Sequence, residues 1–545
     1  DNNVLLAADD DREGDAIAWH CGKVMKVKFN EKNRIIFHEI SKKAIQKAIK
    51  NRHSLNMNSV NAQQARRITD RLVGYSLSPC LWKNIQTEKV GLSAGRVQST
   101  LLKILKEHED KINNFEPEYE YDFTGDFEYD KNKIECELLF DIDDIEPIEI
   151  MKILKKDRIF NLISSKKSEE KKYPGIPFIT SSLQQSAQNE LGFPVKMTMD
   201  IAQKLYENGK ITYMRTDSTY ISKDFQKTIE DKIINEYSKE YYKEFSSKAK
   251  KVKGAQEAHE CIRPTNINHE LNDKWQDHER KLYNLIKKRT IISHMKPAVY
   301  NVLTIDLSNK NMEEIGIFRG KFKSLKFAGY LIYSDKNIKT EKEIEIPRNS
   351  IFNLKTCICK DIESQPPQYY NESTIVKKLE SSGIGRPSTY ASIIATILNR
   401  KYTVVETIPE KQIEIDTTIL NEKNKIMEKK EKKKISSQKN RILLTDLGKI
   451  VLEYLLKYFS TIVNVEFTSL IEQDLDKVAE GSMEWTEVVR KVYNSFYKEV
   501  EIQMKNIAPR LQNKKSDDIS LGKYKNNEVL VKNGRYGPYL NYNGK

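Results

Sequence analysis

Acidic residues crowd together near the start of the 545-residue chain, in the segment VLLAADDDREGDAIAWH, residues 4–20. The apolar run 4–8 predicts a strand buried on both faces, and the apolar spacing after the acids predicts a helix. Side chains alternate along an extended segment, so Asp9, Asp11 and Glu13 would point to one side. Three carboxylates there favour a hard cation such as Mg²⁺ between them. A solvated acidic turn is the alternative interpretation.

A second segment that could do chemistry is ITYMRTDST, residues 211–219. Residues 211–214 predict a short strand that leads into a polar turn. A tyrosine hydroxyl can attack phosphorus, and a guanidinium can stabilise the charge that develops on phosphoryl oxygens. Tyr213 and Arg215 are candidates for these two roles. The alternative is a half-buried strand tyrosine beside a surface arginine.

Two further segments carry groups suited to phosphate. In QEAHECIRPT, His259 could donate a hydrogen bond to a phosphate or tune a neighbouring acid, although a structural role is the alternative. In NAQQARRITDRLVGY, Arg67 and Arg71 are four residues apart and share a helix face with Tyr75. Two cations beside an aromatic ring would suit the phosphates and one stacked base of a nucleic acid strand. A solvated helix face is the alternative there.

Composition sets limits on the function. The chain has 92 Lys and Arg against 78 Asp and Glu, and its net charge of +14 permits a polyanionic partner. Its six cysteines are scattered without a CxxC pair, which argues against a zinc ribbon or a disulfide framework and favours a reducing compartment. No apolar run approaches the roughly 20 residues that span a bilayer. Because the chain opens directly on a predicted buried strand, we expect it to be a fragment.

The pattern along the chain changes several times. Helical periodicity covers 57–110, and alternation of apolar and polar residues predicts antiparallel strands from 111 onward. A mixed region covers 174–298, after which the alternation returns. Strands on both sides of a mixed region predict one β domain with a second domain inserted into it. The Lys-rich run 421–440 predicts a disordered surface insertion, and the final GRYGPYLNYNGK predicts a small β module.

Together these motifs resemble bacterial DNA topoisomerase I, of the type IA family, over nearly the whole chain and in the family's order. AADDDREGDAIAWH resembles the acidic motif of its toprim domain, and ITYMRTDST and EAHECIRPT resemble its tyrosine and histidine motifs. NAQQARRITDRLVGY and GLSAGRVQS resemble its strand-binding segments. LESSGIGRPSTYASIIATIL, residues 379–398, resembles a signature that favours topoisomerase I over topoisomerase III, and GRYGPYL resembles the start of the C-terminal repeats.

The resemblance implies a role for each matching residue. Tyr213 would join the 5′ phosphate of a cut strand, Arg215 would stabilise the phosphoryl transition state, and His259 would lie near the scissile phosphate. The implied Mg²⁺ ligands, the last of them also catalytic, are Asp9, Asp11 and Glu13. The implied strand contacts are Arg66, Arg67, Asp70, Arg71, Tyr75, Ser93, Arg96, Gln98 and Ser99.

The implied fold is multidomain α/β and α+β: a partial toprim α/β domain, helical domains and an antiparallel β arch that form a torus. The implied domains are a partial toprim domain (1–56), the first part of a helical domain that binds the gate strand (57–110), the first part of the β arch (111–173), the active-site tyrosine domain (174–298), the second part of the arch (299–367), the second part of the helical domain with the Lys-rich insertion (368–505) and the start of a C-terminal repeat (506–545).

Two features depart from the family's pattern. Its first toprim strand, which supplies a catalytic glutamate and a lysine, has no match here, so we expect that strand to precede residue 1. Asp10 stands where many members have a proline or another uncharged residue, which adds a charge to the predicted metal site.

The implied function is ATP-independent relaxation of negatively supercoiled DNA by transient single-strand cleavage, strand passage and religation. A phosphotyrosine bond conserves the energy of the cut phosphodiester, so resealing needs no ATP. We expect a monomer that acts on DNA in the cytoplasm, associated with the nucleoid; an AT-rich genome, which Lys and Asn richness suggests, is also found in organelles and viruses. The alternatives are a toprim nuclease or primase, which would not need Tyr213, and a single-stranded-DNA-binding fragment without catalysis.

Overall fold

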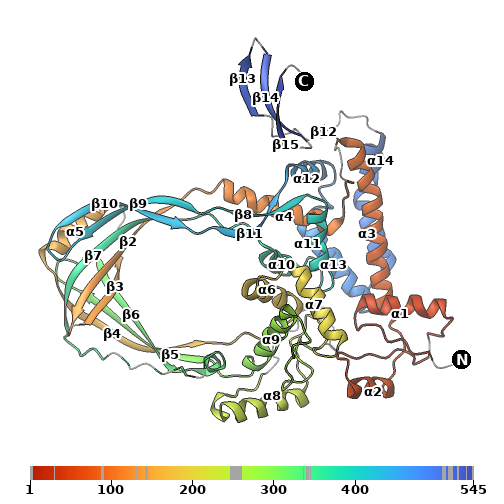
Figure 1. The fold of residues 1–545 in the computed structure, drawn as a ribbon, viewed down its shortest axis with the longest axis horizontal. Coiled ribbons are helices and arrows are strands. Elements are labelled where there is room, and N and C mark those ends of the chain that lie inside the picture. The colour runs from red at the N-terminus through yellow and green to blue at the C-terminus, as the bar shows by residue number, and fades with distance from the viewer. Residues whose placement is uncertain are drawn as a thin grey trace.

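In a computed structural model the chain traces a ring, in which a block of helices faces a large β arch (Figure 1). The segment that carries Tyr213 comes from the middle of the chain, and it closes the ring between the helical block and the arch. The structure describes residues 4–542 except 30, 87–90, 131, 141–144, 246–259, 336, 339, 341–342, 344, 506–510, 513–518, 525–526 and 535–536.

The helices form three groups. The N-terminal segment contains α1 (Arg12–Val24) and α2 (Lys42–Lys50). The larger block contains α3 (Met57–Asn84), α4 (Arg96–Asn113), α10 (Glu372–Ser381), α11 (Tyr390–Asn399), α12 (Asp446–Tyr458), α13 (Val465–Ala479) and α14 (Trp485–Lys505). The group around Tyr213 contains α6 (Thr180–Leu191), α7 (Val195–Glu207), α8 (Lys223–Glu236), α9 (Asp277–Ile292) and the 3-10 helix η1 (Lys239–Tyr241). No helix in the described part of the chain is long and apolar enough to cross a membrane.

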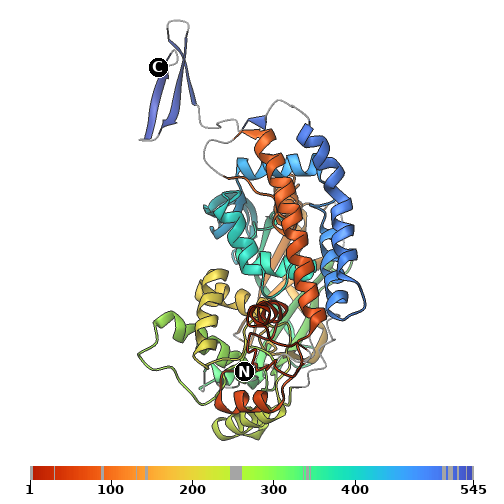
Figure 2. The ribbon, with the colours of Figure 1, turned by 90° about the vertical axis from the view of Figure 1, so that its right-hand side faces the viewer.

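The longest helix, α3, connects the parts of the larger block. Its N-cap residue Asn56 accepts hydrogen bonds from the amides of Asn58 and Ser59, which satisfies the free donors of the first turn. Its buried face packs against α1, α13 and α14, and Figure 2 shows α3 and α14 side by side. The apolar side chains of α3, α4 and α10–α14 form one core. The exposed face of α3 is therefore held rigidly.

The β arch is one antiparallel sheet with the strand order β10-β9-β7-β2-β3-β6-β5-β4, in which β4 also pairs with β7. The pairing of β4 with β7 closes six of these strands, β7-β2-β3-β6-β5-β4, around an apolar core. The helix α5 (Pro147–Lys156) adds apolar side chains to this core. The strands are β2 (Tyr119–Tyr129), β3 (Asn132–Phe140), β4 (Ile159–Lys172), β5 (Ala298–Ser308), β6 (Gly316–Phe327), β7 (Ile351–Glu363), β9 (Lys411–Leu420) and β10 (Ile426–Ile435). Because β2–β4 precede the tyrosine segment and β5–β7 follow it, that segment is inserted into the sheet.

The remaining elements are short. A 3-10 helix, η2 (Gly329–Tyr333), follows β6. β1 (Ile85–Gln86) pairs in parallel with β12 (Leu511–Gln512), and β8 (Thr403–Ile408) pairs with β11 (Gln438–Leu444). β13 (Ile519–Tyr524), β14 (Asn527–Gly534) and β15 (Gly537–Tyr542) form the small C-terminal sheet that the sequence predicts.

Two predicted strands are absent from the structure. The prediction that 4–8 is a strand buried on both faces is wrong: Leu6 makes an isolated bridge to Arg34, and Val4 and Ala7 are exposed. The predicted strand at 211–214 is likewise an irregular segment with an isolated bridge at its first residue. Apolar residues occur in both segments because Leu6 is buried in the small N-terminal core, and Ile211, Tyr213 and Met214 are buried in the core of the tyrosine segment.

The prediction of a disordered insertion at 421–440 is also wrong. Most lysines of this run lie on β10, which pairs with β9 along its whole length. Acids on the neighbouring strand neutralise part of the charge, because Lys430 lies opposite Asp416 and Lys432 opposite Glu414. Lysines on an edge strand also discourage pairing with other chains.

Hydrogen exchange tests this hairpin. Amides of β10 that donate to β9 are expected to exchange at least tenfold more slowly than an unstructured peptide of the same sequence, because exchange then requires local opening. Exchange followed by mass spectrometry on peptides from 421–440 measures the difference. Unprotected amides throughout this run would contradict the structure.

Candidate active site

Tyr213 lies in an irregular segment that polar contacts hold in place. The Thr180 hydroxyl donates to the carbonyls of Met214 (2.7 Å) and Thr216 (3.0 Å) and accepts from the Thr216 amide (2.8 Å). The Tyr213 amide donates to the carbonyl of His38 at 2.7 Å. The segment is therefore fixed both to its own domain and to the N-terminal segment.

A glycine after α7 lets these two parts approach each other. Gly209 has φ +64°, and a Cβ atom at this position would lie 2.4 Å from the carbonyl oxygen of Ile40. A larger residue would therefore strain the backbone and push the N-terminal segment away.

The Tyr213 side chain is nearly buried, with 3% of its surface exposed. Its ring packs edge-on against Tyr206, and its hydroxyl donates a 2.6 Å hydrogen bond to Oδ2 of Asp11. Burial, the charge of Asp11 and this hydrogen bond together raise the pKa of Tyr213. The phenol is therefore neutral and needs a base to become a nucleophile.

Asp11 also shapes the acidic turn. It is the N-cap of α1, where its Oδ1 accepts from the Gly14 amide at 2.7 Å. A Cβ atom on Gly14 would lie 2.0 Å from the carbonyl oxygen of Asp9, so the turn requires glycine there. Burial and the neighbouring charge of Asp11 raise the pKa of Asp9. The turn thus holds two carboxylates close together.

The predicted three-carboxylate metal site is not assembled as the sequence suggests. Within the described residues, no group of three or more His, Cys, Asp or Glu side chains is arranged to hold a metal ion. Because α1 begins at Arg12, Glu13 lies in a helical turn, and its carboxylate pairs with Arg215 at 3.1 Å. Asp9 and Asp11 still fit a divalent cation chemically, since their mutual repulsion is what a cation would relieve.

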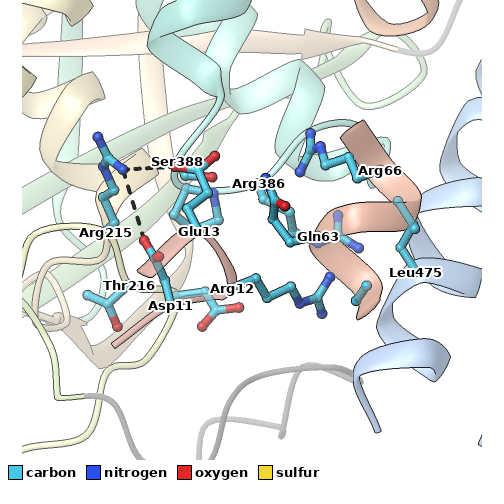
Figure 3. Close-up of a pocket in the computed structure, with 13 residues that line it drawn as sticks. Asp11, Arg12, Glu13, Gln63, Arg66, Arg215, Thr216, Arg386, Ser388 and Leu475 are labelled. Carbon is cyan, nitrogen blue, oxygen red and sulfur yellow. Dashed lines mark hydrogen bonds and ion pairs between the residues drawn. The ribbon is translucent and has the colours of Figure 1, made fainter. Parts of the chain in front are cut away.

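Arg215 lies at the edge of a pocket between three parts of the chain (Figure 3). Besides Glu13, its guanidinium lies 4.0 Å from Oδ2 of Asp11, the oxygen that accepts from Tyr213. The pocket is lined by Asp11, Arg12, Glu13, Ala62, Gln63, Arg66, Arg215, Thr216, Asp217, Arg386, Pro387, Ser388 and Leu475.

The predicted strand contacts fall into exposed and buried sets. Arg67, Arg71 and Tyr75 are exposed on α3, and Arg71 donates to the Tyr75 hydroxyl at 3.1 Å. Arg96 and Ser99, in contrast, are buried, so their side chains do not reach a DNA strand in this conformation. A buried arginine needs a partner, and Arg96 has carboxylate partners inside the block.

The other predicted contacts are partly exposed. Asp70 lies 3.4 Å from Arg96 and 3.8 Å from Arg66, so it supports arginines rather than facing phosphate itself. Gln98 donates to the carbonyl of Ser93 at 3.3 Å. His259 lies outside the described residues.

Comparison with known proteins agrees with this geometry. A family model described as DNA topoisomerase matches residues 54–429. The structure of full-length topoisomerase I from Thermotoga maritima is similar to this one with a TM-score of 0.75 and 34% sequence identity, over 99% of this chain and 84% of that chain. The chain belongs to the DNA topoisomerase family. The resemblance to bacterial topoisomerase I and the predicted multidomain fold are thereby confirmed.

Sequence reasoning missed one arginine that shapes the acidic turn of this topoisomerase. Arg34 is buried and donates to the carbonyls of Ala8 (2.5 Å) and Asp9 (2.6 Å) and to the carboxylate of Asp15 (3.1 Å). The pattern around it, EKNRII, resembles an ordinary polar turn, so nothing marked it in advance.

Two missed residues line the pocket. Arg12 and Arg386 both contact Asp476 on α13, each at 2.6 Å. Arg12 lies in the acidic motif and Arg386 lies in GRPSTYA. Their place in these motifs could have marked both as candidate site residues. Asp476 lies on α13 in a stretch without a motif, so the sequence did not mark it as a site residue.

Removing the Thr180 hydroxyl tests how the tyrosine segment is held. Thr180→Val keeps the side-chain shape but leaves two carbonyls and one amide without this partner, which should cost about 1–3 kcal/mol of unfolding free energy. Denaturant unfolding measures the loss.

Thr198→Val is the matched control, because its buried hydroxyl donates to the carbonyl of Pro194, the N-cap residue of its own helix. Thr180→Val should also slow formation of any covalent DNA adduct, whereas Thr198→Val should not. Equal effects of the two substitutions would contradict the role given to Thr180.

Proposed function

We propose that this chain is a type IA DNA topoisomerase, an isomerase that relaxes negatively supercoiled DNA without ATP. The observation that carries the proposal is the Tyr213 hydroxyl, which is hydrogen-bonded to Asp11 at a pocket that also presents Arg215. The topoisomerase family match and the ring-shaped fold support it.

The chemistry follows from the positions of these groups. The Tyr213 oxygen attacks a backbone phosphorus of one strand while its proton passes to Oδ2 of Asp11, 2.6 Å away. The phosphorus–O3′ bond breaks, the 3′ oxygen takes a proton from solvent while Asp11 returns its proton to solvent, and the 5′ phosphate stays on the tyrosine. Arg215 stabilises the charge on the phosphoryl oxygens. Attack by the 3′ hydroxyl reverses each step and reseals the strand after passage of another.

Mg²⁺ is the proposed cation, and Asp9 and Asp11 are the residues that would hold it. When bound, it would supply positive charge to the phosphate and to the acidic turn. The chain's own contribution is the turn geometry, in which Arg34 and Gly14 keep these two carboxylates together. Glu13 would join them only by leaving Arg215.

The proposed substrates are a single-stranded gate segment and negatively supercoiled duplex DNA, bound by a monomer in the bacterial cytoplasm. Arg67, Arg71 and Tyr75 offer exposed cations and a ring for the phosphates and a base of the gate strand. A toprim nuclease or primase would use the acidic turn without a protein nucleophile. The hydrogen bond from Tyr213 to that turn therefore favours covalent chemistry.

Tyr213→Phe tests the nucleophile. The substitution keeps the ring packed on Tyr206 and removes the attacking oxygen, so relaxation and adduct formation should fall to background while single-strand affinity changes less than about twofold. A gel assay of plasmid relaxation and fluorescence anisotropy with an oligonucleotide measure these effects in the full-length protein. Relaxation by the variant would overturn the assignment.

Asp9→Asn tests the cation site. The Mg²⁺ concentration for half-maximal relaxation should rise about tenfold or more, because one carboxylate ligand is lost. Glu207→Gln is the matched control: its charge lies near Asp9 and raises the pKa of that residue, yet it is outside the turn. The same Mg²⁺ dependence in both variants would remove Asp9 from the cation site.

A further inference from the structure

Two arginines that line the pocket approach the same buried carboxylate oxygen. Arg66, on α3, and Arg386, in the loop before α11, lie 3.8 Å and 4.0 Å from Oε2 of Glu472. The other oxygen, Oε1, accepts a 2.8 Å hydrogen bond from Arg96. Glu472 on α13 therefore stands behind the pocket wall, with three guanidinium groups around it.

Glu472 is charged although it is buried. Only 1% of its surface is exposed, and burial alone would raise its pKa. The positive charges of Arg66, Arg96 and Arg386 outweigh burial and lower the pKa to about 2. The carboxylate is therefore ionised at neutral pH, and a buried charge of this kind is stable only with its partners in place.

Arg386 is also held by hydrogen bonds to the carboxylate of Asp476 (2.6 Å) and to the carbonyl of Gly385 (2.7 Å). The remaining N–H groups of Arg66 and Arg386 can still donate to a ligand in the pocket. Oε2 of Glu472 is buried and has no hydrogen-bond partner among the described residues, because Arg66 and Arg386 lie beyond hydrogen-bond distance. Attraction at this range still acts, since charges separated by about 4 Å interact strongly away from water. Without a carboxylate between them, two guanidinium groups facing one pocket would repel each other.

We propose that Glu472 is a positioning residue of the pocket, which holds Arg66 and Arg386 together to bind one phosphate of the DNA strand. The inference rests on the proposed function. Figure 3 shows both arginines at the pocket, on the side opposite Arg215. A phosphate facing the two arginines would accept hydrogen bonds from guanidinium N–H groups that do not reach Glu472.

The proposal and simple charge counting predict opposite results for Glu472→Gln. Removing a negative charge beside a DNA site should strengthen binding if only net charge matters. If Glu472 positions the arginines, the substitution should weaken single-strand affinity about tenfold, because the two guanidinium groups separate. Fluorescence anisotropy with a single-stranded oligonucleotide and the full-length protein measures the sign directly.

Asp474→Asn is the matched control. Asp474 is a buried carboxylate of the same helix, but it pairs with Lys477 and Lys491, away from the pocket. Both substitutions should lower thermal stability, whereas weaker strand binding should appear for Glu472→Gln alone. Equal or tighter strand binding by Glu472→Gln, or equal weakening in the control, would overturn the proposal.

A double-mutant cycle separates positioning from general damage to the fold. In an Arg66→Ala background, Glu472→Gln should weaken strand binding by less than about threefold, because the group it acts through is gone. In the wild-type background it should raise the KM for plasmid relaxation about tenfold and change kcat by less than about twofold. The full tenfold weakening in both backgrounds, or a loss confined to kcat, would contradict the proposal.

These results are distinguishable from failure of the proposed function. If the wild-type protein forms no tyrosine adduct, the proposed function is wrong, whatever the variants do. If the wild-type protein forms the adduct and Glu472→Gln binds the strand as well as the wild type, only the positioning role is wrong.

Discussion

The hydrogen bond between Tyr213 and Asp11 joins two parts of the chain that are 202 positions apart in the sequence. A buried phenol and a half-buried carboxylate both need partners, and here each satisfies the other. Neighbouring contacts repeat this pattern: Arg215 pairs with Glu13, and the Tyr213 amide donates to His38. The ring is therefore closed at this point mainly by polar groups, and those same groups are the ones that the proposed chemistry uses.

The apolar cores explain why polar contacts carry the junction. The helical block, the tyrosine segment and the N-terminal segment have largely separate apolar cores, joined by Val195 of α7 in the core of the block and by Ile40, which packs against the core around Tyr213. The pocket lies where these three parts meet. Hydrogen bonds and ion pairs at such a boundary can be exchanged for contacts with a charged strand. Opening a single continuous core would instead expose apolar surface to water, and the free-energy cost would grow with the area exposed. This arrangement suits a ring that must open to let a strand pass.

The motifs in the sequence selected residues that the structure brings together, but they did not predict the geometry of those residues. Tyr213, Arg215 and Asp11 were identified from their motifs, and the structure brings all three to one place. The alternation in the strands and the periodicity in 57–110 likewise indicated the arch and the long helices. These signals are local, because each depends on side chains a few positions apart.

What the sequence could not show depends on distant partners. Arg96 has the appearance of a strand contact until its carboxylate partner, 376 positions away, is known. The lysines of β10 suggested disorder because the acids that face them lie on another strand. Glu13 was placed on one face with Asp9 by assuming an extended chain, whereas the helix begins at Arg12 and turns it toward Arg215.

The most direct test of the account is to locate the covalent bond between protein and DNA. The full-length protein is incubated with a single-stranded oligonucleotide, denatured during turnover and digested, and the adduct peptides are sequenced by mass spectrometry. The account predicts one modified peptide, in which Tyr213 carries the 5′ phosphate of the cleaved strand. An adduct on any other residue, or cleavage without an adduct, would contradict it.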